Sequence, residues 1–262
     1  MKYLVLADLH YDFWLDAKRN PFSGVEEEIA DLDLLILAGD LSNKPQVRWK
    51  TVFAALARLL PLERVHVISG NHDYYNYRFD AEDRLEEFAT AAGAHYTNCA
   101  EVLSGGMRFL CATLWTDYEL EPGRAVNEHY IPRRLNDYRL IRVASDGYRA
   151  LWPSDVVKRH VVHLRWLERT LSEPFEGPTF VVTHHAPHPD VLGWHSGDLG
   201  AAYASDLESL ILKHQPTAWL YGHCHDGGDM TVGKTKISNV SLGYPHDVAD
   251  PAARIRALIR SV

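Results

Sequence analysis

The chain has 262 residues, of which 46% are hydrophobic and 24% are charged, and its formal net charge is −8. This length and composition are typical of a globular protein with one well-buried core. The negative charge argues against a broad nucleic-acid-binding surface, which needs a basic stripe, but it does not exclude a phosphate ester bound through metal ions.

Strand and helix patterns alternate through the first half of the chain, as expected for βαβ units. Apolar runs typical of buried strands occupy residues 3–7, 34–38, 65–69 and 107–112. Helices are predicted near residues 25–30, 46–60 and 81–92, the last of them ended by Gly93. This order favours an α/β fold.

The second half is predicted to hold two helices, two strands and a hairpin. The helices span 153–171 and 205–213, the strands span 179–183 and 217–221, and the hairpin pairs 230–232 with 236–240. Two stretches, 114–152 and 184–200, lack periodicity, and irregular segments of this length are usually lids or binding loops. We therefore predict a single domain, residues 1–262, with lid-like loops at about 114–152 and 184–200.

Cysteine usage and the N-terminus indicate the compartment. Cys99, Cys111 and Cys224 form no CxxC pair and are odd in number, so a disulfide framework is not expected. The segment before Asp8 is too short for the apolar region of a signal peptide, and no apolar run is long enough to span a membrane. We expect a soluble cytoplasmic protein, and its oligomeric state stays open.

Five short polar clusters each follow one of the predicted strands. They are Asp8-Leu9-His10, Gly39-Asp40, Gly70-Asn71-His72-Asp73, Thr183-His184-His185 and Gly222-His223-Cys224-His225. In open α/β sheets, ligands bind beyond the carboxyl ends of the strands. Five clusters at five strand ends therefore predict one shared site.

The residue types in these clusters favour metal binding. In Asp8-x-His10 and His223-x-His225, alternation along a strand would point both side chains of a pair the same way, and would turn Cys224 away into the core. Carboxylates, imidazoles and an amide oxygen without thiolate suit Mn, Fe or Zn better than Mg or Ca. Taken singly, Gly39-Asp40 also fits an ordinary turn or a helix N-cap.

His72 follows the candidate ligand Asn71 and faces elsewhere, so it is suited to proton transfer. His185, at the start of the second irregular loop, is a further candidate contact to substrate. His188 and His195 lie in the same loop and fit either a substrate contact or a structural role. No Ser or Cys with a paired base is evident, so a covalent intermediate is not expected.

The order of these clusters resembles the calcineurin-like metallophosphoesterase superfamily, whose motifs are D-x-H, G-D, G-N-H-D, H and G-H-x-H. The match runs from Asp8 to His225. Three further stretches are similar to the small, single-domain bacterial branch of this superfamily: Thr-His-His-Ala-Pro at 183–187, Thr-Leu-Trp-Thr-Asp-Tyr at 113–118 and Asn-Asp-Tyr-Arg at 136–139. The last stretch adds Arg139 as a candidate substrate contact. The resemblance implies a four-layer α/β/β/α sandwich with two mixed β-sheets and a metal site at the strand carboxyl ends.

The resemblance also implies individual roles. Asp8, His10 and His225 would hold a first metal, Asn71, His184 and His223 a second, Asp40 would bridge both, and His72 would donate a proton to the leaving group. Protein Ser/Thr phosphatases of the superfamily carry G-D-x-x-D-R-G, where this chain has Gly-Asp-Leu-Ser-Asn-Lys-Pro at 39–45. Because the acid that pairs with the catalytic histidine and the phosphate-binding arginine are both missing there, a protein phosphatase is not expected. The group that orients His72 stays open.

These inferences favour a dinuclear phosphoester hydrolase that uses a metal-bridging hydroxide on a small phosphodiester such as a cyclic nucleotide. One alternative is a phosphomonoesterase acting on a small metabolite or nucleotide. Another is a metal-binding scaffold that docks a protein partner and has no activity. Turnover of an aryl phosphodiester by remetallated protein would separate the hydrolases from the scaffold.

Overall fold

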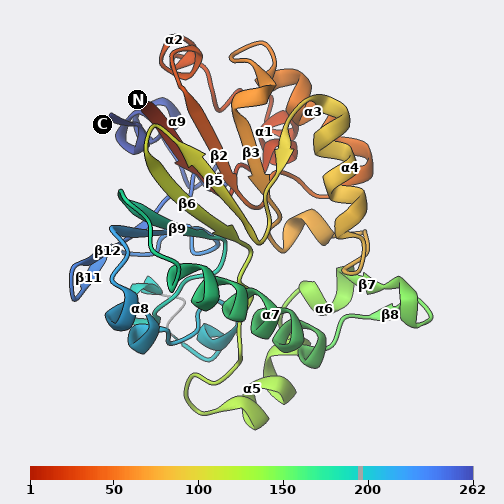
Figure 1. Ribbon diagram of the computed structural model, residues 1–262. Coiled ribbons are helices and arrows are strands. Elements are labelled where there is room, and N and C mark those ends of the chain that lie inside the picture. Colours follow the sequence, from red (N-terminus) through yellow and green to blue (C-terminus); the bar gives the residue numbers. More distant parts are fainter. Residues whose placement is uncertain (194–196, 262) are drawn as a thin grey trace.

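Two mixed β-sheets form the centre of the computed structural model, which describes residues 1–193 and 197–261 (Figure 1). The first sheet has the order β13-β1-β2-β3-β4 and the second β11-β12-β10-β9-β6-β5. The first contains β1 (Lys2–Leu6), β2 (Leu34–Ala38), β3 (Val65–Ile68), β4 (His95–Tyr96) and β13 (Arg260–Ser261). The second contains β5 (Ala100–Ser104), β6 (Met107–Ala112), β9 (Thr179–Thr183), β10 (Ala218–Tyr221), β11 (Met230–Val232) and β12 (Thr235–Asn239).

Parallel strands lie inside each sheet and antiparallel strands at its edges. In the first sheet β1 to β4 are parallel and β13 is antiparallel to β1. In the second, β12, β10, β9 and β6 are parallel, while β11 and β5 pair with them antiparallel. All the parallel strands of a sheet therefore end at the same edge, which is where a shared site can form.

Alternate residues of the second sheet pack against two different layers. Phe109 and Phe180 face the first sheet, where the ring of Tyr3 lies 5.3 and 5.9 Å from theirs. Leu110 and Val181, one residue further along each strand, pack in a separate cluster with helix residues such as Leu167. This period of two is the pattern of a strand buried on both faces.

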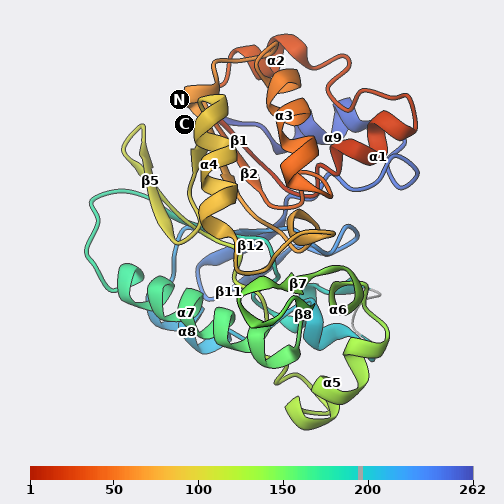
Figure 2. The same cartoon turned by 90° about the vertical axis from the view of Figure 1, so that its right-hand side faces the viewer.

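Helices cover the outer face of each sheet, which completes the four layers (Figures 1 and 2). The helices are α1 (Tyr11–Asp16), α2 (Glu26–Ala30), α3 (Pro45–Leu56), α4 (Glu82–Ala92), α5 (Arg124–Tyr130), α6 (Asp137–Leu140), α7 (Pro153–Leu171), α8 (Glu208–His214) and α9 (Pro251–Leu258). In both views α3 and α4 lie with the first sheet, and α7 and α8 with the second. The predicted α/β/β/α sandwich is confirmed.

Most predicted elements are present within a few residues of their expected ends. The helix predicted at 46–60 ends at Leu56, and residues 57–59 form a turn that leads to Pro61, before which a residue disfavours helix. The helix predicted from Ser205 begins at Glu208, since the Ser205 hydroxyl instead donates to the Asp117 carboxylate at 3.0 Å. The three cysteines are free, as expected, and Cys224 is buried in the core.

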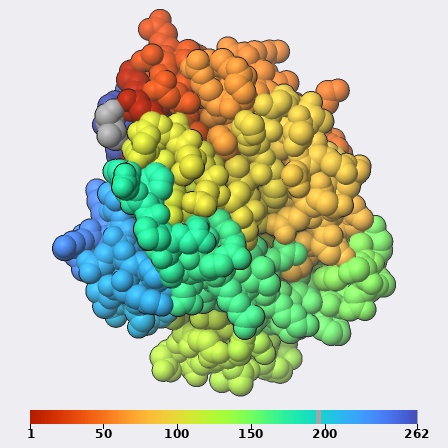
Figure 3. Space-filling view, viewed as in Figure 1, coloured from red at the N-terminus to blue at the C-terminus, as the bar shows by residue number. Residues whose placement is uncertain are grey.

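The prediction that residues 114–152 lack regular structure is wrong. This segment contains α5, α6 and a small hairpin of β7 (Arg142–Val143) with β8 (Arg149–Ala150). Its elements are two to seven residues long, too short to show an amphipathic period in the sequence. Part of it protrudes at the lower edge of the molecule, below α7 (Figure 3). Among the residues described, no helix combines the length and apolarity that a membrane span requires.

Candidate metal and catalytic site

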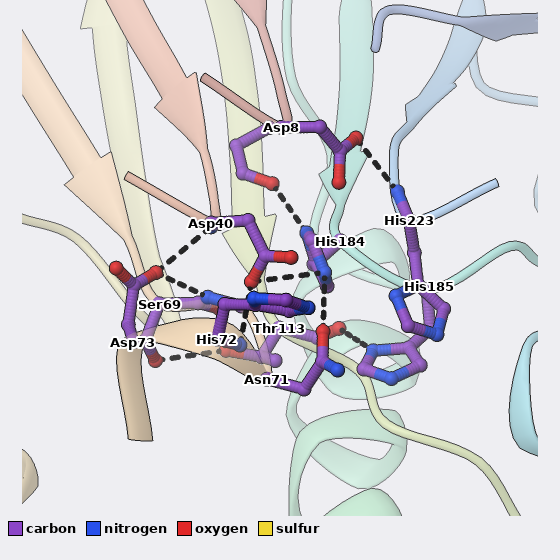
Figure 4. A network of polar contacts seen from close by, with 12 residues as sticks. Asp8, Asp40, Ser69, Asn71, His72, Asp73, Thr113, His184, His185 and His223 are labelled. Carbon is purple, nitrogen blue, oxygen red and sulfur yellow. Dashed lines mark hydrogen bonds and ion pairs between the residues drawn. The ribbon is translucent and has the colours of Figure 1, made fainter. Parts of the chain in front are cut away.

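Five strand ends deliver the predicted ligands to one place. Asp8 and Asp40 follow β1 and β2, Asn71 follows β3, and His184 and His223 follow β9 and β10 of the second sheet. A backbone contact between Ala7 and Ser241 joins the two sheets at this edge. Figure 4 shows Asp40, Asn71 and His184 pointing toward one another from the two sheets.

The backbone at four of the seven candidate ligands is left-handed. The φ angles are 56° at Asp8, 42° at His10, 58° at Asp40 and 66° at His223. The strand alternation expected for Asp8 with His10 and for His223 with His225 is therefore wrong, because these residues lie beyond the strand ends, although Asp8 and His10 still face the same half of the site. Non-glycine residues held in this region cost about 1–3 kcal/mol each and gather at functional sites. The turns send His223 and His225 to different halves of the site.

The first half of the site brings together Asp8, His10 and His225. Nε2 of His225 lies 3.5 Å from Asp8 Oδ1, Nε2 of His10 lies 3.9 Å from the same oxygen, and the two nitrogens are 3.1 Å apart. On its outer side, Nδ1 of His225 lies 3.5 Å from Asp247 Oδ2. A ring that donates from Nδ1 to a carboxylate keeps its Nε2 lone pair for a metal.

In the second half of the site, three hydrogen-bond acceptors face one another. His184 Nδ1 donates to Ala38 O at 3.0 Å, which leaves a lone pair on Nε2. That nitrogen faces Asn71 Oδ1 at 3.2 Å and Asp40 Oδ1 at 3.5 Å. The Asn71 amide is oriented by Asp137, which accepts from its Nδ2 at 3.0 Å. A nitrogen and two oxygens that converge in this way fit a bound cation.

The charges in this buried space also fit a metal. Burial and the nearby Asp8 raise the pKa of Asp40 well above its usual value. Burial opposes ionisation of Asp8, yet His225 holds the pKa of Asp8 well below its usual value. Burial lowers the pKa of His10, His184 and His223, so these imidazoles are neutral and can act as ligands.

Asp73 orders the loop that carries Asp40. Its carboxylate accepts hydrogen bonds from the backbone N–H groups of Asp40 at 2.8 Å, Ser42 at 3.2 Å and Gly70 at 2.9 Å, and from the Trp49 indole at 3.0 Å. The oxygens of Asp73 are engaged in this way, and the His72 ring makes its hydrogen bonds to other residues. Asp73 ties the ends of β2 and β3 together.

His72 lies against the first half of the site, with its ring stacked on Tyr75 at a centroid distance of 4.1 Å. Its Nδ1 lies 3.1 Å from Asn43 Oδ1, and its Nε2 lies 3.5 Å from the Tyr244 hydroxyl. Its backbone N–H donates to Asp40 Oδ1 at 2.8 Å. Burial lowers the pKa of His72 to about 3, so the ring is neutral in the free site.

A cleft of about 750 Å³ opens beside these residues. Its walls include Tyr75, Arg134, Leu199, Tyr203 and Tyr244, none of which the sequence singled out as a residue, although Arg134 and Leu199 lie in the two segments expected to form lids. Arg134 and Asp137 come from the 114–152 segment. The sequence did not single out either residue, although Asp137 lies in the stretch 136–139 and the whole segment is crowded with Arg, Asn, Asp and Tyr.

The three predicted substrate contacts that the structure describes, His185, His188 and Arg139, do not line this cleft. His185 is buried behind His223, at a ring distance of 4.4 Å, and its Nδ1 donates to Thr113 O. His188 lies near Asp206 and Glu208. Arg139 lines a separate hollow with Arg78 and Arg142. His195 lies outside the described residues.

Comparison with known proteins identifies relatives over most of the chain. A sequence profile of the calcineurin-like phosphoesterases matches residues 1–227. A search of curated proteins found no match. Among solved structures, a phosphopantetheinyl hydrolase from Mycobacterium tuberculosis has a TM-score of 0.69 and 17% identity, covering 100% of this chain and 95% of that one. A purple acid phosphatase from yellow lupin (Lupinus luteus) has a TM-score of 0.54 and 12% identity, covering 92% of this chain and 43% of that one.

Proposed function

This chain belongs to the calcineurin-like phosphoesterases, a family of dinuclear metal-dependent hydrolases, and from that premise we propose that it hydrolyses a small phosphodiester such as a cyclic nucleotide. The proposal places two ions in the site described above. Asp8, His10 and His225 would hold one, Asn71, His184 and His223 the other, and Asp40 would lie between them. Their nitrogen and oxygen donors suit Mn, Fe or Zn. Bound ions supply positive charge against the ester and an activated water.

The charge of the cleft supports a diester over a monoester. Of the residues described along its walls, Arg134 is the one arginine or lysine, while Asp137, Asp226 and Asp247 add negative charge. A phosphomonoester carries about −1.5 to −2 at neutral pH, whereas a diester carries a single charge. With so little cationic charge outside the metal ligands, the less anionic ester is favoured.

The size and lining of the cleft support a substrate with a sizeable organic group. Its volume of about 750 Å³ is in the range that drug-sized ligands fill, and much of its wall is apolar or aromatic. Tyr75, Tyr203 and Tyr244 offer ring faces on which a base can stack. A bare phosphate would leave most of this surface in contact with water.

The leaving group of a diester gives His72 a task. An alkoxide is a poor leaving group and needs a proton as its bond to phosphorus breaks. His72 Nε2 faces the cleft beside the candidate ligands, close to the Tyr244 hydroxyl. Although burial lowers the pKa of His72 to about 3, an anionic ester bound beside the ring favours its protonated form.

We also propose that the chain acts as one domain in which segments 114–152 and 184–200 cover the cleft. Arg134 and Leu135 of the first segment and Leu199 of the second line its walls. The two segments touch where the Tyr130 hydroxyl donates to Asp198 Oδ2 at 2.8 Å. This contact would let both segments close over a bound ester together.

A substrate panel tests the proposed reaction. Chelated protein is reloaded with Mn, Fe or Zn and given cyclic nucleotides, dinucleotides, phosphomonoesters and a phosphopantetheinyl ester, the last because one structural relative is named for that activity. We expect kcat/KM for the best diester to exceed that for every monoester by about tenfold or more, and to vanish in Asp40→Asn. A preference for monoesters would support the phosphomonoesterase alternative. Two bound metals without any turnover would support the scaffold.

A further inference from the structure

Asn43 lies between His72 and a second buried carboxylate, that of Asp12. Asn43 Oδ1 is 3.1 Å from His72 Nδ1, and Asn43 Nδ2 donates to Asp12 Oδ2 at 2.9 Å. The three residues come from separate parts of the chain: Asp12 from α1, Asn43 from the loop after β2, and His72 from the turn after β3. They form a continuous line of hydrogen bonds that ends at the cleft.

Asp12 does not touch the cleft. It is 4% exposed and lines a different hollow of about 220 Å³ together with Ser42, Arg48 and Thr51. Its Oδ2 lies 3.6 Å from the Arg48 guanidinium, and its Oδ1 has no hydrogen-bond partner among the described residues. Burial raises the pKa of the Asp12 carboxyl, and Arg48 and Asn43 oppose that rise.

The carboxylate decides which way the Asn43 amide faces. An ionised carboxylate can only accept hydrogen bonds, so the amide must present its NH₂ to Asp12 and its oxygen to His72. The oxygen in turn accepts the proton of His72 Nδ1. An inverted amide would set NH₂ against Nδ1, which would move the proton of the neutral ring to Nε2 and oppose the doubly protonated ring.

We propose that Asp12 and Asn43 are positioning residues that keep a proton on Nδ1 of His72, so that Nε2 is the atom that exchanges a proton in the cleft. This rests on the proposed role of His72. Asn43 occupies the sequence position at which protein phosphatases of the superfamily carry an acid. In this chain the acid is Asp12, which reaches His72 through the Asn43 side chain. The arrangement keeps the charge of Asp12 away from Asp8 and Asp40, where a third carboxylate would add repulsion.

Leaving-group dependence measures this effect. Asp12→Asn keeps the shape of the side chain but can donate or accept, so it frees the Asn43 amide to invert; Asn43→Ala removes the link altogether. Both should lower kcat by about tenfold or more on a diester with a ribose leaving group, and by less than about twofold on a nitrophenyl diester. Asp16→Asn, an exposed position on the same helix, is the matched control. Equal losses on both substrates would overturn the proposal.

Two further variants separate positioning from mere structural support. In a His72→Ala background, Asp12→Asn should cost no further activity, because the positioned ring is gone. The exchange Asp12→Asn with Asn43→Asp should restore kcat on the ribose diester, since the carboxylate introduced at position 43 would accept from both neighbours. An additive loss in the first case, or no rescue by a folded exchange variant, would contradict the proposal.

The ring itself can be observed without turnover. ¹⁵N spectra of histidine-labelled, metal-loaded protein, with His72 assigned by its absence in His72→Gln, should show the proton on Nδ1. Asp12→Asn should reduce that form, and Asp16→Asn should leave it unchanged. A His72 tautomer identical in wild type and Asp12→Asn would overturn the proposal. Because no substrate is involved, this result is independent of whether the protein hydrolyses diesters.

Discussion

Gly70 is the position at which the site tolerates a side chain least. A Cβ there would lie 2.2 Å from Asp40 Oδ1, 2.6 Å from His184 Cε1 and 2.7 Å from the Asp40 nitrogen. Such contacts do not fall below 3.0 Å, so Gly70→Ala must push the Asp40 oxygen away by about 0.8 Å. Metal–ligand distances tolerate about 0.2 Å, and a misplacement of about 1 Å costs about 10²-fold in rate.

We therefore expect Gly70→Ala to bind fewer than two metals per chain and to lose about 10²-fold in kcat/KM, with overpacking costing about 1–3 kcal/mol of stability. Elemental analysis, kinetics on a nitrophenyl diester and urea unfolding measure these three quantities. Gly228→Ala is the control, because no described atom lies within 4 Å of a Cβ there. A Gly70→Ala protein with two bound metals and activity within about twofold of wild type would refute this reasoning.

Three further predictions address other parts of the molecule. Asp137→Ala frees the Asn71 amide, so a metal titration should show about 10–100-fold weaker binding at one of two sites and an unchanged second site. Arg134→Ala should raise KM about tenfold with unchanged metal content, whereas its exposed neighbour Arg133→Ala should not. Burial lowers the pKa of His163 to about 3, whereas the pKa of a histidine in an unfolded chain is about 6.5. Because the native state therefore binds fewer protons than the unfolded state, the free energy of unfolding falls as the pH drops below 6.5. Between pH 6.5 and 5 the protonation of this group should lower the free energy of unfolding by about 2 kcal/mol. His163→Asn should remove this part of the pH dependence. A pH dependence of stability that is the same in His163→Asn and in wild type would contradict the prediction.

The position of the candidate site could be predicted from the sequence because its candidate ligands lie just beyond the ends of strands. Buried parallel strands are recognisable as apolar runs, and their carboxyl ends meet at one edge. Asp40 and His184, from different sheets and 144 residues apart in the numbering, are 3.5 Å apart for this reason. The local geometry could not be predicted in this way, since the left-handed turns at Asp8 and His10 make their backbone hydrogen bonds to Gly39, Asp40 and Gly243, which lie far away in the sequence.

The residues that orient the site were beyond sequence reasoning. Asp137 contacts Asn71 from 66 positions away, and Tyr244 approaches His72 from 172 positions away. Neither follows a predicted strand, and although Asp137 lies in the Asn-Asp-Tyr-Arg stretch at 136–139, nothing in the sequence pairs it with Asn71. Such contacts arise from the tertiary arrangement of short elements, for which a single sequence carries no periodic signal. Arg139 belongs to the same stretch as Asp137 yet lines a different hollow, so the motif alone does not say which of its residues reach the site.

The most direct test of the proposed reaction compares two leaving groups in His72→Ala. A ribose alkoxide needs a proton to depart, whereas a nitrophenolate does not. We predict a loss of about 10²–10⁴ in kcat on a ribose phosphodiester and a loss below about tenfold on a nitrophenyl phosphodiester, with two metals still bound. Equal losses on both substrates, in a folded variant that holds both metals, would contradict the account.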